Sequence, residues 1–146
     1  MNDTIIDPPL TTVLANKLYL GDLYDSTNED LLNQNGITCI INVSRHEGNS
    51  SNDYNNYWLP LIDGDGNEQY EFDNAVSVLT DMLNKNEVVL IHCLAGISRS
   101  ATVLCCWWAK TNNISFDEAK EIIKLLRPIN PHYKLEELAK KYLGEI

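Results

Sequence analysis

Two residues of the sequence, Cys93 and Arg99, are of types and at a spacing that suit chemistry on an anion. The apolar segment 88–91 leads into them and is typical of a short buried strand in a parallel sheet. The apolar run 101–109 follows them, lacks the alternation of a strand and suits a buried helix. Between the two lie small residues around Gly96. The segment therefore predicts a strand, a tight loop and a helix.

A tight loop at the start of a helix forms an anion site, because the first backbone N–H groups of a helix have no partner within it. The helix dipole adds partial positive charge there, and inward-turned N–H groups form a nest for the same anion. Gly96 permits backbone angles that other residues resist, and Arg99 can bind two phosphate oxygens. Such sites lower a cysteine pKa from about 8.5 to about 3.5–7.5, so we expect Cys93 to be a thiolate nucleophile aimed at phosphorus.

The residues from His92 to Ser100 read His-Cys-Leu-Ala-Gly-Ile-Ser-Arg-Ser. This segment resembles the signature of the cysteine-dependent protein phosphatases, in which His-Cys is followed by five variable residues, Arg, and Ser or Thr. With Ala101 and Thr102 included, it is similar to the dual-specificity branch in particular. The Cys and Arg spacing alone is weak evidence, since rhodanese-like proteins share it. The full segment between a strand and a helix is far more specific.

The resemblance covers residues 14–143 and implies an α/β fold of the protein tyrosine phosphatase type. That fold has a central parallel-rich sheet of about four or five strands flanked by helices. The alternation of predicted strands and helices independently indicates such a sheet, with helices on both faces. We expect residues 13–146 to form a small, single catalytic domain. Residues 1–12 are polar, contain Pro8-Pro9, and are expected to form a flexible arm.

The resemblance also implies roles for individual residues. Ser100 is expected to donate a hydrogen bond to Cys93 and ease its departure as a leaving group, and His92 is expected to order the loop from behind. The phosphate is expected to bind the side chain of Arg99 and the backbone N–H groups of Leu94, Ala95, Gly96, Ile97, Ser98 and Arg99. No metal or cofactor is needed, since the loop and Arg99 supply the electrostatic stabilisation.

A thiolate can displace an alkoxide or phenoxide from phosphorus only if the leaving oxygen is protonated, which calls for a nearby carboxylic acid. Asp63 follows a predicted strand thirty residues before Cys93, where the resembled family carries its acid. Asp65 is the alternative, and either residue could simply belong to a turn. A calcium loop spanning Asp63, Asp65 and Asn67 is rejected, because glycine and glutamate are missing at its sixth and twelfth positions.

The composition argues against several classes of function. The chain has 146 residues, is 44% hydrophobic and carries a net charge of −10, which argues against binding nucleic acid or anionic membranes. It contains no apolar run long enough to span a membrane, and its start lacks the features of a secretory signal. We therefore expect an intracellular protein, cytoplasmic or nuclear. The four cysteines show neither a disulfide framework nor zinc-ligand spacing.

The remaining elements follow from periodicity and turn signals. Strands are expected at 18–21, 37–43 and 57–62, the last near a sheet edge because of Pro60. Helices are expected at 26–35, 71–84, 115–126 and 134–143, and capping boxes are expected at Ser26–Glu29 and Ser115–Glu118. The polar loop 44–56 carries Arg45 and His46, which either contact substrate or are simply solvated. Asn130-Pro131 resembles a turn that packs behind the active-site loop, and His132 is expected to be a surface or capping residue.

These observations predict an enzyme that hydrolyses phosphotyrosine and phosphoserine or phosphothreonine in proteins through a phosphocysteine. Its partners are expected to be phosphorylated proteins, and phosphate, sulfate or vanadate should bind its loop. One alternative keeps this chemistry on a phosphoinositide, an RNA 5′-phosphate or a phosphoglucan. Another is a catalytically silent phosphopeptide-binding module. The sequence specifies neither the oligomeric state nor the preference for tyrosine over serine and threonine.

Overall fold

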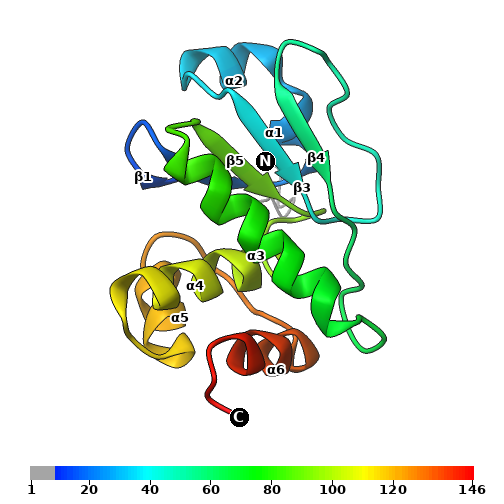
Figure 1. Cartoon of the computed structure of the whole chain (residues 1–146). Helices are drawn as coiled ribbons and strands as arrows, with labels where there is room; N and C mark the ends of the chain where they lie inside the picture. The colour runs from blue at the N-terminus through cyan, green and yellow to red at the C-terminus, as the bar shows by residue number, and fades with distance from the viewer. Residues whose placement is uncertain (1–8) are drawn as a thin grey trace, which may run out of the picture.

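The computed structural model of the protein describes residues 9–146, and the first part of the predicted arm, residues 1–8, lies outside the described residues. Strands and helices alternate over much of this part of the chain (Figure 1). The strands are β1 (Thr11–Leu14), β2 (Leu18–Gly21), β3 (Cys39–Asn42), β4 (Asn55–Trp58) and β5 (Val89–His92). The helices are α1 (Leu23–Thr27), α2 (Glu29–Gln34), α3 (Gln69–Asn84), α4 (Arg99–Asn112), α5 (Phe116–Lys124) and α6 (Tyr133–Tyr142).

Within residues 9–146 the strands form one five-stranded sheet in the order β1-β2-β5-β3-β4. β1 pairs with β2 in antiparallel fashion, and every other pair is parallel, which confirms the predicted parallel-rich α/β sheet. The register aligns the carboxyl ends of the parallel strands: Gly21 and Asn42 both pair with His92, and Asn42 pairs with Trp58. The segments that follow these strands therefore leave the sheet at one edge, where open α/β sheets bind their ligands.

Alternate strand residues face two separate hydrophobic cores. On one face, Leu20, Ile41 and Ile91 pack in the larger core with apolar residues of α3, α4, α5 and α6. On the other face, Leu90 packs with Leu32 of α2 in a smaller core. Figure 1 shows α3 crossing the sheet, with α4, α5 and α6 gathered beyond it. Burial on both faces explains why β5 is an uninterrupted apolar run and not an alternating one.

The helices that surround the predicted loop form as expected. α4 begins at Arg99, immediately after the loop, and extends to Asn112, a few residues beyond the apolar run at each end. α5 has Ser115 as its N-cap and the predicted reciprocal capping box with Glu118. His132 is the N-cap of α6, and its ring accepts a hydrogen bond from the Lys134 backbone N–H.

The capping box predicted at Ser26–Glu29 is wrong. Ser26 lies inside α1, where its buried hydroxyl donates to the Leu23 carbonyl oxygen. Asp22 caps α1 in its place, in a reciprocal box with Asp25, and Asn28 starts α2. The predicted single helix is thus two short helices. The first starts earlier because Asp22 caps it in place of Ser26, and the second starts at the separate cap Asn28.

Two strand boundaries also differ from the prediction. β1 begins at Thr11, inside the segment expected to be an arm, because Thr11 and Thr12 pair with Leu20 and Tyr19 of β2. β4 covers 55–58 instead of 57–62 and forms a sheet edge as predicted. The prediction for β4 ran too far because the chain beyond Trp58 is apolar. The strand ends at Trp58, and only the N–H groups of Leu59 and Leu61 still bond the carbonyls of Asn42 and Val43 before the loop that carries Asp63.

Candidate active site

The loop 93–98 joins β5 to α4 at the centre of the sheet's carboxyl edge. Gly96 adopts a left-handed backbone conformation, with φ of +69°. A Cβ atom there would collide with the backbone of Gly21 and lie 2.6 Å from a guanidinium nitrogen of Arg127, so only glycine fits. Ser98 occupies the N-cap position of α4, but its side chain makes no cap hydrogen bond. The first N–H groups of α4 are therefore left to the Cys93 sulfur, which accepts from the Ser100 N–H, and to an anion.

Cys93 lies at the start of this loop and is 2% exposed. Burial opposes ionisation of its thiol, but hydrogen bonds from the Ser100 hydroxyl and the backbone N–H groups of Ser100 and Gly96, together with the Arg99 guanidinium, outweigh it and lower the pKa of Cys93. The Ser100 Oγ to Cys93 Sγ distance is 3.2 Å. The structure thus gives Ser100 the contact that the resemblance implied.

The other three cysteines lie in the core and behave differently. Burial raises the pKa of Cys39 and of Cys105 to about 12, and it also raises that of Cys106. All three are free thiols, and none is exposed. Cys93 is therefore the one thiol of residues 9–146 whose surroundings favour the thiolate.

His92 is fully buried behind the loop. Burial lowers its pKa to about 4, so the ring is neutral at neutral pH. Nδ1 lies 3.0 Å from the Cys93 carbonyl oxygen and must donate, because a carbonyl can only accept. This contact fits the predicted role of His92 in ordering the loop.

The side chain of Arg99 is buried under the same loop. Nη1 donates to the Leu61 carbonyl oxygen at 3.3 Å, whereas Nε is buried without a hydrogen-bond partner among the described residues. A buried N–H group without a partner is costly. A bound oxyanion would supply that partner.

Asp63 and Cys93 line one cavity of about 310 Å³, together with Leu94, Ala95, Ile97, Ser98, Arg99 and Asn130. Asp63 is held in its loop by the side chain of Asn67, which accepts from the Ile62 N–H at 2.8 Å and donates to the Ile62 and Gly64 carbonyls at 2.8 and 3.3 Å. Asp65 lies elsewhere and lines a different cavity with Lys134 and other residues. Of the two predicted candidates, the structure thus brings Asp63 to Cys93.

Sequence reasoning missed Arg127, which it placed only as the residue that follows the helix expected at 115–126. The residue is 1% exposed, and its guanidinium lies beneath the loop, where Nε and Nη2 donate to the carbonyls of Gly96 and Ala95 at 2.8 and 3.0 Å. Nη1 donates to the carbonyl oxygens of Pro9 and Leu20. An arginine followed by proline after an amphipathic helix gives no local sign of burial, so only the fold reveals this role.

Asn130 packs against the loop: its backbone N–H donates to the Ile97 carbonyl oxygen at 2.9 Å, and the residue also lines the cavity that holds Cys93. Arg45 and His46 are exposed, and neither lines the cavity that holds Cys93.

Among residues 9–146, no group of three or more His, Cys, Asp or Glu side chains is arranged to hold a metal ion. No helix in the same range is long and apolar enough to cross a membrane.

Comparison with known proteins identifies the family to which the chain belongs. The model of the dual-specificity phosphatase catalytic domain matches residues 18–140. Human dual specificity protein phosphatase 1 is 36% identical over 114 residues, which are 77% of this chain and 31% of that protein. Human dual specificity protein phosphatase 6 is 36% identical over 121 residues, or 80% and 32% of the two chains. The chain therefore spans about a third of the length of these relatives.

Solved structures share the fold. The crystal structure of human DUSP28 superposes with a TM-score of 0.82 at 24% identity and covers 94% of each chain. That of a human tyrosine phosphatase-like serine/threonine/tyrosine-interacting protein superposes with a TM-score of 0.81 at 23% identity, covering 92% of this chain and 95% of that one. The layers and connections described above are thus those of this fold.

The environment of Cys93 predicts selective, pH-dependent alkylation. Because its pKa is lowered, the thiolate persists below the ordinary value of about 8.5, and the rate of reaction with iodoacetamide should level off at a correspondingly low pH. Ser100→Ala should move the midpoint upward by about one pH unit, since it removes a hydrogen bond to the thiolate. Mass spectrometry of the alkylated peptides checks both expectations. A midpoint unchanged by Ser100→Ala would contradict this account.

The contacts of Arg127 predict a large effect on stability. Arg127→Met should lower the free energy of unfolding by about 3 kcal/mol, because buried carbonyls lose a charged donor. Denaturant titration followed by circular dichroism measures the change. Lys124→Met, an exposed substitution at the end of α5, is the control and should change stability by less than about 0.5 kcal/mol. Equal effects of the two substitutions would show that Arg127 does not support the loop.

Proposed function

This chain belongs to the dual-specificity phosphatase catalytic domain family, and we propose that it hydrolyses phosphotyrosine and phosphoserine or phosphothreonine in proteins through a phosphocysteine. The observation that carries the proposal is the meeting of Cys93, Arg99 and Asp63 in one cavity. Each supplies one requirement of phosphoryl transfer: a nucleophile, a phosphate-binding cation and an acid. A binding module without turnover would need neither a lowered pKa at Cys93 nor a carboxyl group beside it.

In the first step, the phosphate binds the backbone N–H groups of 94–99 and the guanidinium of Arg99. The Cys93 thiolate attacks phosphorus opposite the leaving oxygen, so that the S–P bond forms as the P–O bond breaks. The carboxyl group of Asp63 gives its proton to the departing oxygen, which leaves as a neutral hydroxyl. The loop and Arg99 stabilise the charge on the other phosphate oxygens throughout.

In the second step, the carboxylate of Asp63 takes a proton from a water molecule while the water oxygen attacks phosphorus. The S–P bond breaks, and inorganic phosphate and the Cys93 thiolate are released. The hydroxyl of Ser100, 3.2 Å from the sulfur, stabilises the thiolate as it leaves. No proton or electron from another reagent is required, so the cycle closes without a cofactor.

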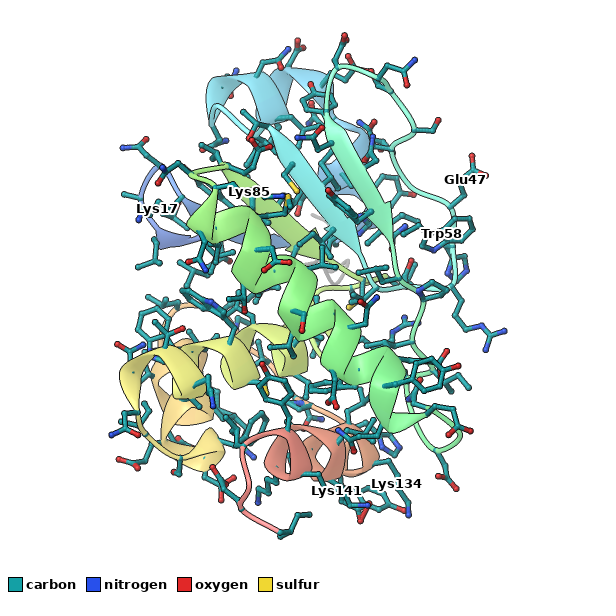
Figure 2. All side chains as sticks on the ribbon, viewed as in Figure 1. Lys17, Glu47, Trp58, Lys85, Lys134 and Lys141 are labelled. Atoms are coloured by element: carbon teal, nitrogen blue, oxygen red, sulfur yellow. The ribbon has the colours of Figure 1, made fainter. Side chains whose placement is uncertain are left out.

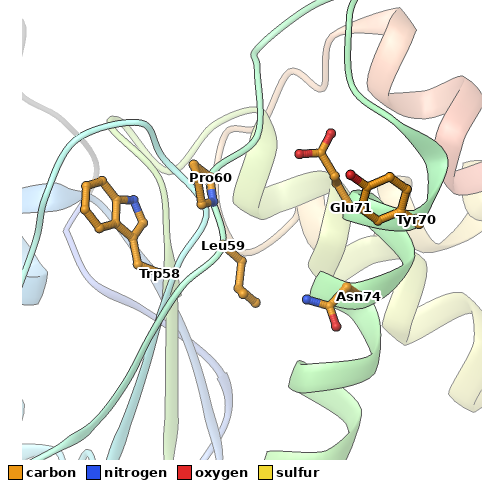
Figure 3. Close-up of a pocket in the computed structure, with 6 residues that line it drawn as sticks. All are labelled: Trp58, Leu59, Pro60, Tyr70, Glu71 and Asn74. Atoms are coloured by element: carbon orange, nitrogen blue, oxygen red, sulfur yellow. The ribbon is translucent and has the colours of Figure 1, made fainter.

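A protein substrate is supported by a groove beside the acid loop, which we name the Trp58 groove. It consists of two adjoining hollows of about 450 and 330 Å³ that share Trp58, Pro60 and Glu71. Tyr70 lines its far end and is 70% exposed, and Trp58 is 49% exposed. Figure 3 shows Trp58 on one side of Pro60 and Tyr70 and Glu71 on the other. Ile62, the residue before Asp63, lines the nearer hollow.

Two features make this groove suitable for a polypeptide. The indole N–H of Trp58 donates to the Ser44 carbonyl oxygen at 2.8 Å, which holds the ring as a rigid apolar anchor. Charged side chains also line these hollows: Glu71 lines both, Arg45 lines only the nearer one, and Glu47 lines a further hollow that shares Trp58. Figure 2 shows Glu47 close to Trp58. We propose that the substrate residues beside the phosphorylated residue lie here, with an apolar side chain against Trp58 and a basic one near Glu71 in the farther hollow, which Arg45 does not line. The loop 94–98 carries no lysine that would favour a multiply charged lipid headgroup.

The proposed activity is tested with phosphotyrosyl and phosphothreonyl peptides in EDTA. Cys93→Ser should abolish turnover while retaining vanadate binding, because the hydroxyl is not ionised but the loop is intact. Asp63→Ala should reduce kcat by about 10²–10⁴, the usual contribution of a general acid. Asp65→Ala is the matched control and should be close to wild type. Turnover by Cys93→Ser, or a greater loss in Asp65→Ala than in Asp63→Ala, would refute these assignments.

The Trp58 groove predicts a loss confined to peptide substrates. Tyr70→Ala and Trp58→Ala should each reduce kcat/KM about tenfold for a phosphopeptide with leucine and lysine beside the phosphotyrosine, because an exposed aromatic contact is lost. Hydrolysis of para-nitrophenyl phosphate should be unchanged. Leu125→Ala, which removes an exposed apolar side chain at the end of α5, is the control. Equal losses on both substrates would place the effect in the catalytic site and not in the groove.

A further inference from the structure

Ser98 departs from the usual behaviour of a serine at the start of a helix. An N-cap serine normally accepts a hydrogen bond from the backbone N–H two or three residues further along. Ser98 occupies this position in α4 but makes no such bond. A capping hydroxyl would accept from the N–H of Ser100 or Ala101, whereas the Ser100 N–H bonds the Cys93 sulfur in this structure, so the orientation of Ser98 leaves that N–H to the thiolate.

The hydroxyl of Ser98 joins two other loops instead. Oγ donates to Asp63 Oδ1 at 2.6 Å and accepts from the His132 backbone N–H at 2.9 Å. Asp63 lies on the loop after β4, and His132 starts α6, so three segments distant in sequence meet at one oxygen. Because a hydroxyl has a single hydrogen, the His132 contact fixes the direction in which Ser98 donates.

Asp63 depends strongly on this contact. Its side chain is exposed, and no other hydrogen bond to its carboxyl group is formed by the described residues. Asn67 and Arg99 position the backbone on either side of Asp63, but they leave the carboxyl group free to rotate. The Ser98 hydroxyl occupies Oδ1 and leaves Oδ2 to carry the proton.

We propose that Ser98 is a positioning residue that holds the carboxyl group of Asp63 over Cys93 with Oδ2 directed at the leaving oxygen. This inference rests on the proposed function, since it assigns a partner to the proposed general acid. Displacement of a reacting group by about 1 Å can cost up to about 100-fold in rate, so the loss of one orienting contact should be measurable. The effect should appear only where protonation of the leaving group limits the reaction.

The test compares two aryl phosphates that differ in leaving group. Phenyl phosphate releases a phenol of high pKa and needs an acid, whereas dinitrophenyl phosphate releases an acidic phenol and does not. Ser98→Ala should reduce kcat about tenfold on phenyl phosphate and less than about twofold on dinitrophenyl phosphate. In the Asp63→Asn background, which has no acid to position, Ser98→Ala should cause no further loss on phenyl phosphate. Ser98→Gly provides the same comparison, since glycine is well tolerated at an N-cap.

Ser115→Ala is the matched control, because Ser115 is the N-cap of α5 and caps its own helix. It should lower the melting temperature and leave the ratio of the two rates unchanged. Equal losses on both substrates for Ser98→Ala, or a full further loss in the Asp63→Asn background, would overturn the positioning role. Absence of wild-type turnover on both substrates would instead refute the proposed function, so the two failures are distinguishable.

Discussion

The active-site loop depends on one constraint: its N–H groups can serve an anion only if its carbonyl groups bond elsewhere. Each carbonyl oxygen from Cys93 to Ser98 accepts a hydrogen bond from outside the anion site. The donors, in chain order, are His92 Nδ1, the Leu23 N–H, Arg127 Nη2, Arg127 Nε, the Asn130 N–H and the Thr102 N–H. These donors come from β5, α1, α4 and the segment between α5 and α6. The fold therefore forms the site largely by providing hydrogen-bond donors to the carbonyl groups of one loop.

The same arrangement explains how a chain with a net charge of −10 can bind an anion. The positive charge is concentrated where water is excluded: Arg99 and Arg127 are both buried at the loop, and the dipole of α4 points toward it. Charge in a low-dielectric setting acts more strongly than the same charge at the surface, where salt and water screen it. The neutral ring of His92 adds a hydrogen bond without competing for the phosphate.

Sequence reasoning worked where the information is local. The strand, loop and helix around Cys93 follow from a contiguous segment, and the cap at Ser115 follows from adjacent residues. It failed where two nearby residues could both cap a helix, as for Ser26 and Asp22. It also failed where pairing with a neighbouring strand determines whether a segment is a strand, as for β1. It placed Arg127 only as the residue that follows a helix and Ser98 as one of several loop residues. Their contacts join segments more than thirty positions apart, which no local pattern encodes.

The bonds of Arg127 also have a consequence for how the protein is made. The side chain reaches Pro9, 118 positions earlier in the chain, as well as Gly96. A nascent chain that has emerged from the ribosome only as far as α4 contains Cys93, Arg99 and Asp63 but not Arg127 or Asn130, whose N–H groups bond the carbonyls of residues 95–97. The middle of the loop therefore lacks these hydrogen bonds until residues 127–130 have been synthesised. Completion of the active-site loop is thus a late event in biosynthesis.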